Sequence, residues 1–272
     1  MLKSIVCTRV NHMNVVCENF DAGVAHLHEI YGAEFMADMP QREWHAGLVE
    51  MGRVIFELFV PHDFLLNARY GPHYVGVEYQ ADMDDVRAAI GAHGIRIARD
   101  IGLALHTHPG DCFGIAFEFY GGYFHDRDWP LLGGKIKSAS YWQDEHPLGL
   151  TGLKGYTVAV RDIEAARAFF QSFLGGDVVY EARRPALAAR AVGLQIADAI
   201  VELVTPVADG ALAAHLERYG EGIRSTLFGV RSIEQAHQYL SKRSIATIEG
   251  GAPGSIAVPA EANLGVIFEF AQ

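Results

Sequence analysis

The chain has 272 residues, of which 50% are hydrophobic and 20% are charged, and its formal net charge is −11. This composition is typical of a globular protein with room for two ordinary domains and a sizeable core. The acidic balance argues against nucleic acid or an anionic membrane as the main partner, so we expect a small-molecule substrate.

The cellular location is indicated by two features of the sequence. No apolar run is long enough to span a membrane, and the first residues lack the layout of a signal peptide. The three cysteines, Cys7, Cys17 and Cys112, are widely spaced and odd in number, which fits reduced thiols better than a disulfide framework. We therefore expect a cytoplasmic protein.

Four copies of one pattern follow one another along the chain. The first copy opens with an alternating strand at residues 10–17 and continues as a helix over 18–35, which Gly32 is expected to cap. The next copies repeat this strand at 73–80, 153–160 and 225–230, and this helix at 82–94, 161–176 and 232–240.

Each copy closes with an apolar strand that carries one glutamate. These strands read VIFELFVP, GIAFEFYGG, AIVELVTP and GVIFEFAQ, and their glutamates are Glu57, Glu118, Glu202 and Glu269. Burying an unpaired carboxylate is costly, so each strand needs a reason for its glutamate. The recurrence indicates an internal repeat with the plan βαβββ, and hence an α+β fold.

The repeats divide the chain into two halves. Copies one and two fill residues 1–126, and copies three and four fill residues 150–272. The segment 127–149 between them is rich in turn formers and mixed in polarity, which predicts a linker.

This arrangement resembles the vicinal oxygen chelate superfamily, which includes glyoxalase I, methylmalonyl-CoA epimerase, extradiol dioxygenases and the bleomycin-resistance proteins. The resemblance covers nearly the whole chain and rests on the repeated opening strand with its helix and the closing strand with its glutamate. It implies that the four modules pair into two glyoxalase-like cupped-sheet domains. It also implies a divalent metal held by the first and last strands of each module, so that the strand glutamate points into the cup.

On this family plan, His12 and Glu57 are the first-module ligand positions, and Glu118 closes the second module. Alternation with period two puts His12 and Asn14 on one face of their strand. Imidazole and carboxylate ligands suit Zn, Ni, Mn, Co or Fe, so we expect one divalent metal ion of open identity.

The fourth ligand position has two candidates. Counting along the opening strands puts Tyr74 in the ligand slot, with Gly76 and Glu78 on the same inward face. His73 lies one residue earlier and would normally point away, although a bulge after Pro72 would re-aim it. We therefore predict His73 as the conventional metal ligand and keep Tyr74 as a direct ligand or a group that assists catalysis.

The second half of the chain differs at these positions. Gly155 and Ser225 occupy the slots that match His12, while Glu202 and Glu269 persist. The sequence therefore predicts a first domain with the metal and active site, and a second domain without metal.

Further residues are predicted to contact the substrate. His106 and His108 have the spacing of a metal pair on one strand, but the following proline and glycine favour a loop end. The predicted substrate-binding residues are Asn14, Trp44, His45, Phe59, Glu78, His106, His108 and Tyr120. Several are aromatic, which favours a partly apolar substrate, aromatic ones included.

The leading functional hypothesis is a metal-dependent enzyme that acts on a small oxygen-rich substrate. The metal would polarise a carbonyl or vicinal oxygens, Glu57, Glu118 or Glu78 would move a proton, and Tyr74 or a histidine would assist at the oxyanion. Isomerase, epimerase, lyase and hydrolase reactions all fit this chemistry.

Two alternatives belong to other classes. The first is an Fe(II) extradiol-type ring-cleavage dioxygenase with His12, His73 and Glu118 as its facial triad. The second is a metal-free protein that sequesters a ligand, as bleomycin-resistance proteins do. Either a monomer or a homodimer is compatible with the sequence.

Overall fold

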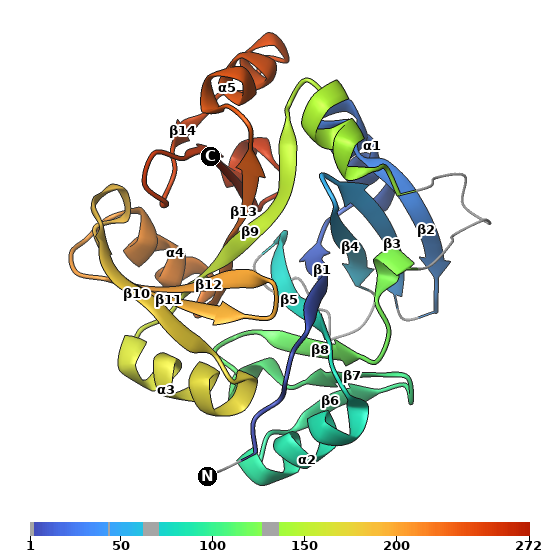
Figure 1. Cartoon of the computed structure of the whole chain (residues 1–272), viewed down its shortest axis with the longest axis vertical. Helices are drawn as coiled ribbons and strands as arrows, with labels where there is room; N and C mark the ends of the chain where they lie inside the picture. The colour runs from blue at the N-terminus through green and yellow to red at the C-terminus, as the bar shows by residue number, and fades with distance from the viewer. Residues whose placement is uncertain (1–2, 43, 62–70, 127–135) are drawn as a thin grey trace. The chain divides into compact units, whose positions relative to one another are not determined.

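The computed structural model describes residues 3–42, 44–61, 71–126 and 136–272 (Figure 1). These residues form two eight-stranded sheets with the orders β2-β3-β4-β1-β5-β8-β7-β6 and β10-β11-β12-β9-β13-β16-β15-β14. The predicted α+β fold of four βαβββ modules is therefore confirmed. No helix in the described part of the chain is long and apolar enough to cross a membrane.

The first sheet is built from two modules. Its strands and helices are β1 (Arg9–Val16), α1 (Phe20–Tyr31), β2 (Glu34–Pro40), β3 (Trp44–Met51), β4 (Val54–Pro61), β5 (His73–Gln80), α2 (Met83–His93), β6 (Ile97–Asp100), β7 (Ala104–Thr107) and β8 (Ala116–Tyr120). Within each module the opening strand pairs parallel with the closing strand, β1 with β4 and β5 with β8, and the remaining pairs are antiparallel. The parallel pair therefore sets each opening strand beside a strand glutamate.

The second sheet repeats this plan with one addition. Its elements are β9 (Leu150–Ala159), α3 (Ile163–Leu174), β10 (Asp177–Arg184), β11 (Ala189–Ile196), β12 (Ala199–Pro206), α4 (Ala211–Tyr219), β13 (Gly222–Val230), α5 (Ile233–Lys242), β14 (Ile248–Glu249), β15 (Ile256–Val258) and β16 (Ile267–Ala271). Helix α4 connects the two modules and was not predicted from the sequence. Short single-turn helices lie at Pro109–Asp111, Phe124–Asp126, Tyr141–Glu145, Pro185–Leu187 and Ala260–Ala262.

Each module helix begins at a polar side chain that caps it. The side chains of Asn19, Asp82, Asp162 and Ser232 accept hydrogen bonds from backbone N–H groups of the first turn. The predicted end of α1 at Gly32 is confirmed, because Gly32 has φ 69° and its N–H bonds the carbonyl of His28. These local signals determine where each helix starts.

The backbone contacts divide the chain into two compact units. One unit contains residues 1–12, 75–126 and 155–224, and the other contains residues 13–74, 127–154 and 225–272. One unit thus combines most of the second and third modules, and the other combines most of the first and fourth. Each sheet is formed by one half of the sequence, whereas each compact unit combines segments from both halves. The predicted domain boundaries therefore stay a prediction.

Candidate metal centre

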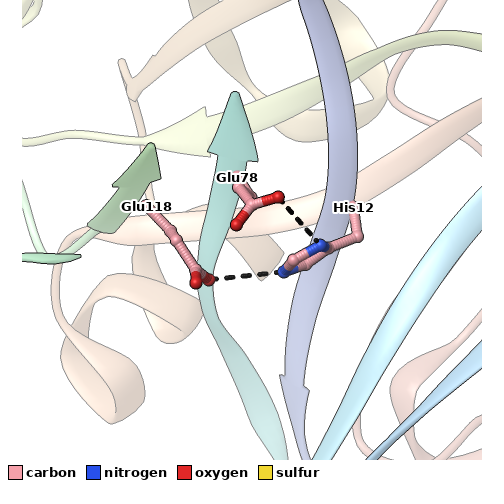
Figure 2. Close-up of side chains that lie close together, drawn as sticks. All are labelled: His12, Glu78 and Glu118. Carbon is pink, nitrogen blue, oxygen red and sulfur yellow. Dashed lines mark ion pairs between the residues drawn. The ribbon is translucent and has the colours of Figure 1, made fainter. Parts of the chain in front are cut away.

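Three strands of the first sheet bring one imidazole and two carboxylates together (Figure 2). His12 on β1, Glu78 on β5 and Glu118 on β8 offer ligand atoms that all lie within 4.8 Å of one another. The imidazole of His12 lies between the carboxylates: Nδ1 is 3.5 Å from Glu78 Oε1, and Nε2 is 3.3 Å from Glu118 Oε2. We call these three residues the His–Glu–Glu cluster.

The strand register explains why these side chains meet. The parallel pairing of β5 with β8 places Glu78 directly opposite Glu118, and residues opposite each other point to the same face. The sheet order puts β1 on the other side of β5, so His12 reaches the same face from there. All three side chains are buried, with Glu118 the most exposed at 8%.

One inward position of β5, Gly76, cannot carry a side chain because strand β8 lies too close to it. A Cβ at Gly76 would lie 1.9 Å from the carbonyl oxygen of Ala116 on β8, so this position accepts only glycine. The next inward position along β5 is Glu78. Strand β5 therefore contributes a carboxylate to the cluster rather than an imidazole.

His106 adds a second imidazole beside the cluster. It lies on β7 directly opposite Glu118, and its Nε2 is 3.2 Å from Glu118 Oε1. Each oxygen of Glu118 therefore faces one imidazole, that of His12 or that of His106. The side chain of His106 is 15% exposed, against 1% for His12, so His106 lies on the solvent side of Glu118.

The electrostatics of Glu118 are set by opposing effects. Burial raises the pKa of Glu118, but the charges and hydrogen bonds of His106 and His12 outweigh burial and hold the pKa well below its ordinary value. Glu118 is therefore a carboxylate anion at neutral pH, and it needs positive charge beside it.

Two of the four predicted metal ligands lie in the cluster, His12 and Glu118, and the other two do not. Glu57 lies on β4 opposite Asn14 of β1. The Nδ1 atom of His73 lies 2.6 Å from the carbonyl oxygen of Gly71, and burial lowers the pKa of this imidazole. Glu78, which the sequence placed among the substrate-binding residues, lies in the cluster.

Tyr74 is also placed outside the cluster. Its hydroxyl donates to the carbonyl of Ile267 at 3.0 Å and accepts from the hydroxyl of Thr226 at 2.9 Å. Counting along the opening strands had put Tyr74 at the position of His12. Strand pairing corrects this count by two residues, because Asn14 faces Glu57 in the first module and Glu78 faces Glu118 in the second.

The remaining predicted substrate-binding residues lie in varied surroundings. Tyr120 follows Glu118 on β8, and its ring centroid is 5.5 Å from that of Phe124. His45 contacts the carboxylate of Asp38, and the Nδ1 atom of His108 accepts from the N–H of Gly110, so both imidazoles have local structural partners. Three others lie on strands of the first module: Asn14 on β1, Trp44 on β3 and Phe59 on β4.

The two strand glutamates of the second sheet are satisfied by other groups. Glu202 accepts from Tyr180 at 2.7 Å and from the guanidinium of Arg184, whose Nε lies 3.0 Å away. Glu269 accepts from the hydroxyl of Ser225 at 2.8 Å and from the N–H of Gly251 at 2.8 Å. The closing-strand glutamates therefore have different partners: Glu118 faces two imidazoles, Glu202 a phenol and a guanidinium, and Glu269 a hydroxyl and a backbone N–H.

Comparisons with known proteins show which families and structures this chain is similar to. Residues 152–252 match the family described as the Glyoxalase/Bleomycin resistance protein/Dioxygenase superfamily. The comparison with curated proteins gave no sequence match.

Two solved structures share the fold over nearly the whole chain, and a third matches a smaller part of it. A mutant of 4-hydroxymandelate synthase from Streptomyces coelicolor has a TM-score of 0.77 over 97% of this chain and 92% of its own, at 14% identity. A xylose isomerase-like TIM barrel/4-hydroxyphenylpyruvate dioxygenase fusion protein has a TM-score of 0.67 over 99% of this chain and 49% of its own, at 13% identity. Methylmalonyl-CoA epimerase from Mycobacterium tuberculosis covers 44% of this chain and 87% of its own, with a TM-score of 0.42 and 22% identity.

At these identities the structural likeness shows the fold. The family match shows that residues 152–252 belong to the glyoxalase/bleomycin resistance protein/dioxygenase superfamily, the vicinal oxygen chelate superfamily, and the remaining described modules repeat the same βαβββ plan.

Proposed function

We propose that this protein is a divalent-metal-dependent enzyme that uses His12, Glu78 and Glu118 as its metal ligands and acts on a small oxygen-rich substrate. One observation carries the proposal: three buried side chains with metal-binding atoms lie within 4.8 Å of one another. The enzyme function and the metal are both part of the proposal, and metal content is the first test.

The spacing of the cluster fits a divalent ion. Donor atoms about 2.1 Å from a common ion lie roughly 3 to 4 Å apart. The contacts of His12, at 3.5 and 3.3 Å, use its two ring nitrogens, Nδ1 toward Glu78 and Nε2 toward Glu118, whereas an ion takes one nitrogen. With one donor atom from each residue, the three atoms lie within 4.8 Å of one another. Small side-chain rotations would bring one atom of each residue to an ion, and one imidazole with two carboxylates suits Mn, Fe, Co, Ni or Zn.

The charge of the cluster also fits a divalent cation. With a neutral imidazole the two carboxylates give the cluster two negative charges in a buried place, which is costly without a counter-charge. A divalent cation balances them. The competing arrangement has protonated His12 and His106 as counter-charges, and metal content distinguishes the two.

Three protein ligands leave coordination positions open, as in catalytic sites. A bound ion would supply Lewis acidity to a carbonyl or vicinal oxygens of the substrate. A carboxylate oxygen of Glu78 or Glu118 would then take a proton from the carbon next to that carbonyl, while His106 holds Glu118 in place. Isomerisation, epimerisation and elimination share this proton transfer, whereas in hydrolysis the same carboxylate would take its proton from water.

The test is metal content by inductively coupled plasma mass spectrometry, on protein without a histidine tag or chelator. His12→Ala and Glu118→Gln should lose near-stoichiometric metal while they keep their fold by circular dichroism. His108→Ala is the matched control, because His108 lies two residues from His106 and caps a short helix. Protein that takes up none of Zn, Ni, Mn, Co or Fe(II) on reconstitution would contradict the proposal.

A second candidate is oxygen chemistry at Fe(II), and the position of His106 favours it. A facial triad needs two histidines and one carboxylate, and His12, His106 and Glu118 are adjacent. His106 thus replaces His73 in the dioxygenase hypothesis. Oxygen uptake by the Fe(II) protein with catechols tests this candidate, and an oxygen-independent reaction that also proceeds with Zn or Mn would contradict it.

A further inference from the structure

We propose that Asn11 is a positioning residue that fastens residues 121–126 so that the ring of Phe124 covers His12 and keeps water from it. This inference deepens the proposed function, and only its metal readout rests on that function. We call residues 121–126 the covering segment.

Asn11 uses both ends of its amide to hold this segment. Its Nδ2 donates to the carbonyl of Gly122 at 3.0 Å, and its Oδ1 accepts from the N–H of Phe124 at 3.1 Å. Asn11 is 1% exposed, so these bonds form away from water, where an amide that loses its partners is costly. The pair of bonds fixes the backbone on both sides of Tyr123.

Phe124 lies flat against the ligand histidine. The ring centroids of Phe124 and His12 are 5.2 Å apart, and the ring planes differ by 5°. Tyr120 supports Phe124 from β8, with ring centroids 5.5 Å apart. The ring of Phe124 therefore covers one face of the imidazole, which agrees with the 1% exposure of His12.

Two contacts that Arg9 makes with the covering segment are weaker. The guanidinium of Arg9 lies 4.4 Å from the ring centroid of Tyr123 and 4.0 Å from the carboxylate of Asp126. These groups are largely exposed, and exposed ion pairs contribute little. Asn11 is thus the contact whose loss should release the segment.

The position of Asn11 in the sequence couples the segment to the site. Asn11 precedes His12 on β1, so one strand carries both the ligand and the residue that fastens its cover. Reagents and exchanging ions that approach His12 from the side of Phe124 must first displace the ring. We therefore expect the reactivity of His12 to follow the opening of residues 121–126.

Two readouts on metal-free protein test this coupling. The first is hydrogen exchange of the Phe124 amide, and the second is modification of His12 by diethyl pyrocarbonate, both followed by mass spectrometry. Asn11→Leu keeps the side-chain size and removes both hydrogen bonds, so both rates should rise about tenfold. Phe124→Ala should raise the modification rate of His12 about tenfold with Asn11 intact, and Phe124→Tyr should stay at the wild-type rate.

Asn263→Leu is the matched control, because Asn263 is a fully buried asparagine in the other compact unit and accepts from Tyr31. It should leave the modification of His12 unchanged. Release of bound Zn to a chelator should also be about tenfold faster in Asn11→Leu, with unchanged stoichiometry. Wild-type rates of exchange and modification in Asn11→Leu would overturn this inference, whereas absence of metal from the wild type would overturn only the proposed function.

Discussion

Glu50 should make the stability of this protein fall as the pH rises from acid to neutral. Glu50 lies on β3 with a fully buried side chain, accepting from the N–H of Arg53 at 2.6 Å and from Trp142 Nε1 at 3.2 Å. Burial raises the pKa of Glu50 from 4.5 to about 7, and these hydrogen bonds only partly offset the effect of burial. The native state therefore favours the protonated carboxyl.

The sign and size of the effect follow from this pKa. Between pH 4.5 and 7 the native state binds more protons at Glu50 than the unfolded state does, so the free energy of unfolding falls as pH rises. Between pH 5 and pH 8 the loss integrates to about 2.5 kcal/mol. Glu50→Gln removes this titration and keeps the shape of the side chain.

The assay is urea unfolding of the wild type and Glu50→Gln at pH 5 and pH 8. The altered hydrogen bonds of Glu50→Gln change its free energy of unfolding by the same amount at both pH values. The informative quantity is therefore how the difference in unfolding free energy between variant and wild type changes with pH. We expect this change to favour the variant at pH 8 by about 2.5 kcal/mol. Glu249→Gln, on the exposed strand β14, controls for the loss of one negative charge. A mutational effect of Glu50→Gln that is equal at both pH values would refute the reasoning.

Three further predictions follow from the described contacts. Glu78→Gln should weaken Zn or Mn binding at least tenfold in calorimetric titration, and unchanged affinity would remove Glu78 from the ligand set. Arg184→Ala should destabilise the fold by about 3 kcal/mol in urea unfolding, because it leaves the buried carboxylate of Glu202 without its guanidinium; a loss within error would contradict this. Gly76→Ala should lower the melting temperature because its Cβ meets a carbonyl oxygen, whereas Gly91→Ala in α2, with open space around it, should not.

The repeated elements could be predicted because their signals are local. Asn19 begins α1 and Gly32 ends it, and both act on backbone groups within a few residues of themselves. Alternation with period two was enough to place Glu78 on the same face of its strand as Gly76 and Tyr74. Helix α4 was missed because it lies between two repeats, outside the repeated pattern.

The identity of the third cluster member depended on contacts between strands. The sequence offered His73 or Tyr74, because imidazole is the familiar ligand and the helix starts were the available reference points. The register of β5 against β8 sets Glu78 opposite Glu118, and this register depends on backbone hydrogen bonds between residues 40 positions apart. Likewise, His106 meets Glu118 only through the pairing of β7 with β8.

The sequence by itself determined the βαβββ repeat, the helix ends, and the inward faces that carry His12 and Glu118, because turns, caps and alternation act over a few residues. Tertiary structure alone decided which inward residues meet, that Arg184 faces Glu202, and that Asn11 holds residues 121–126 beside His12. These outcomes depend on strand register and on side chains far apart in the chain. A shift of one residue in register would send every side chain of a strand to the other face.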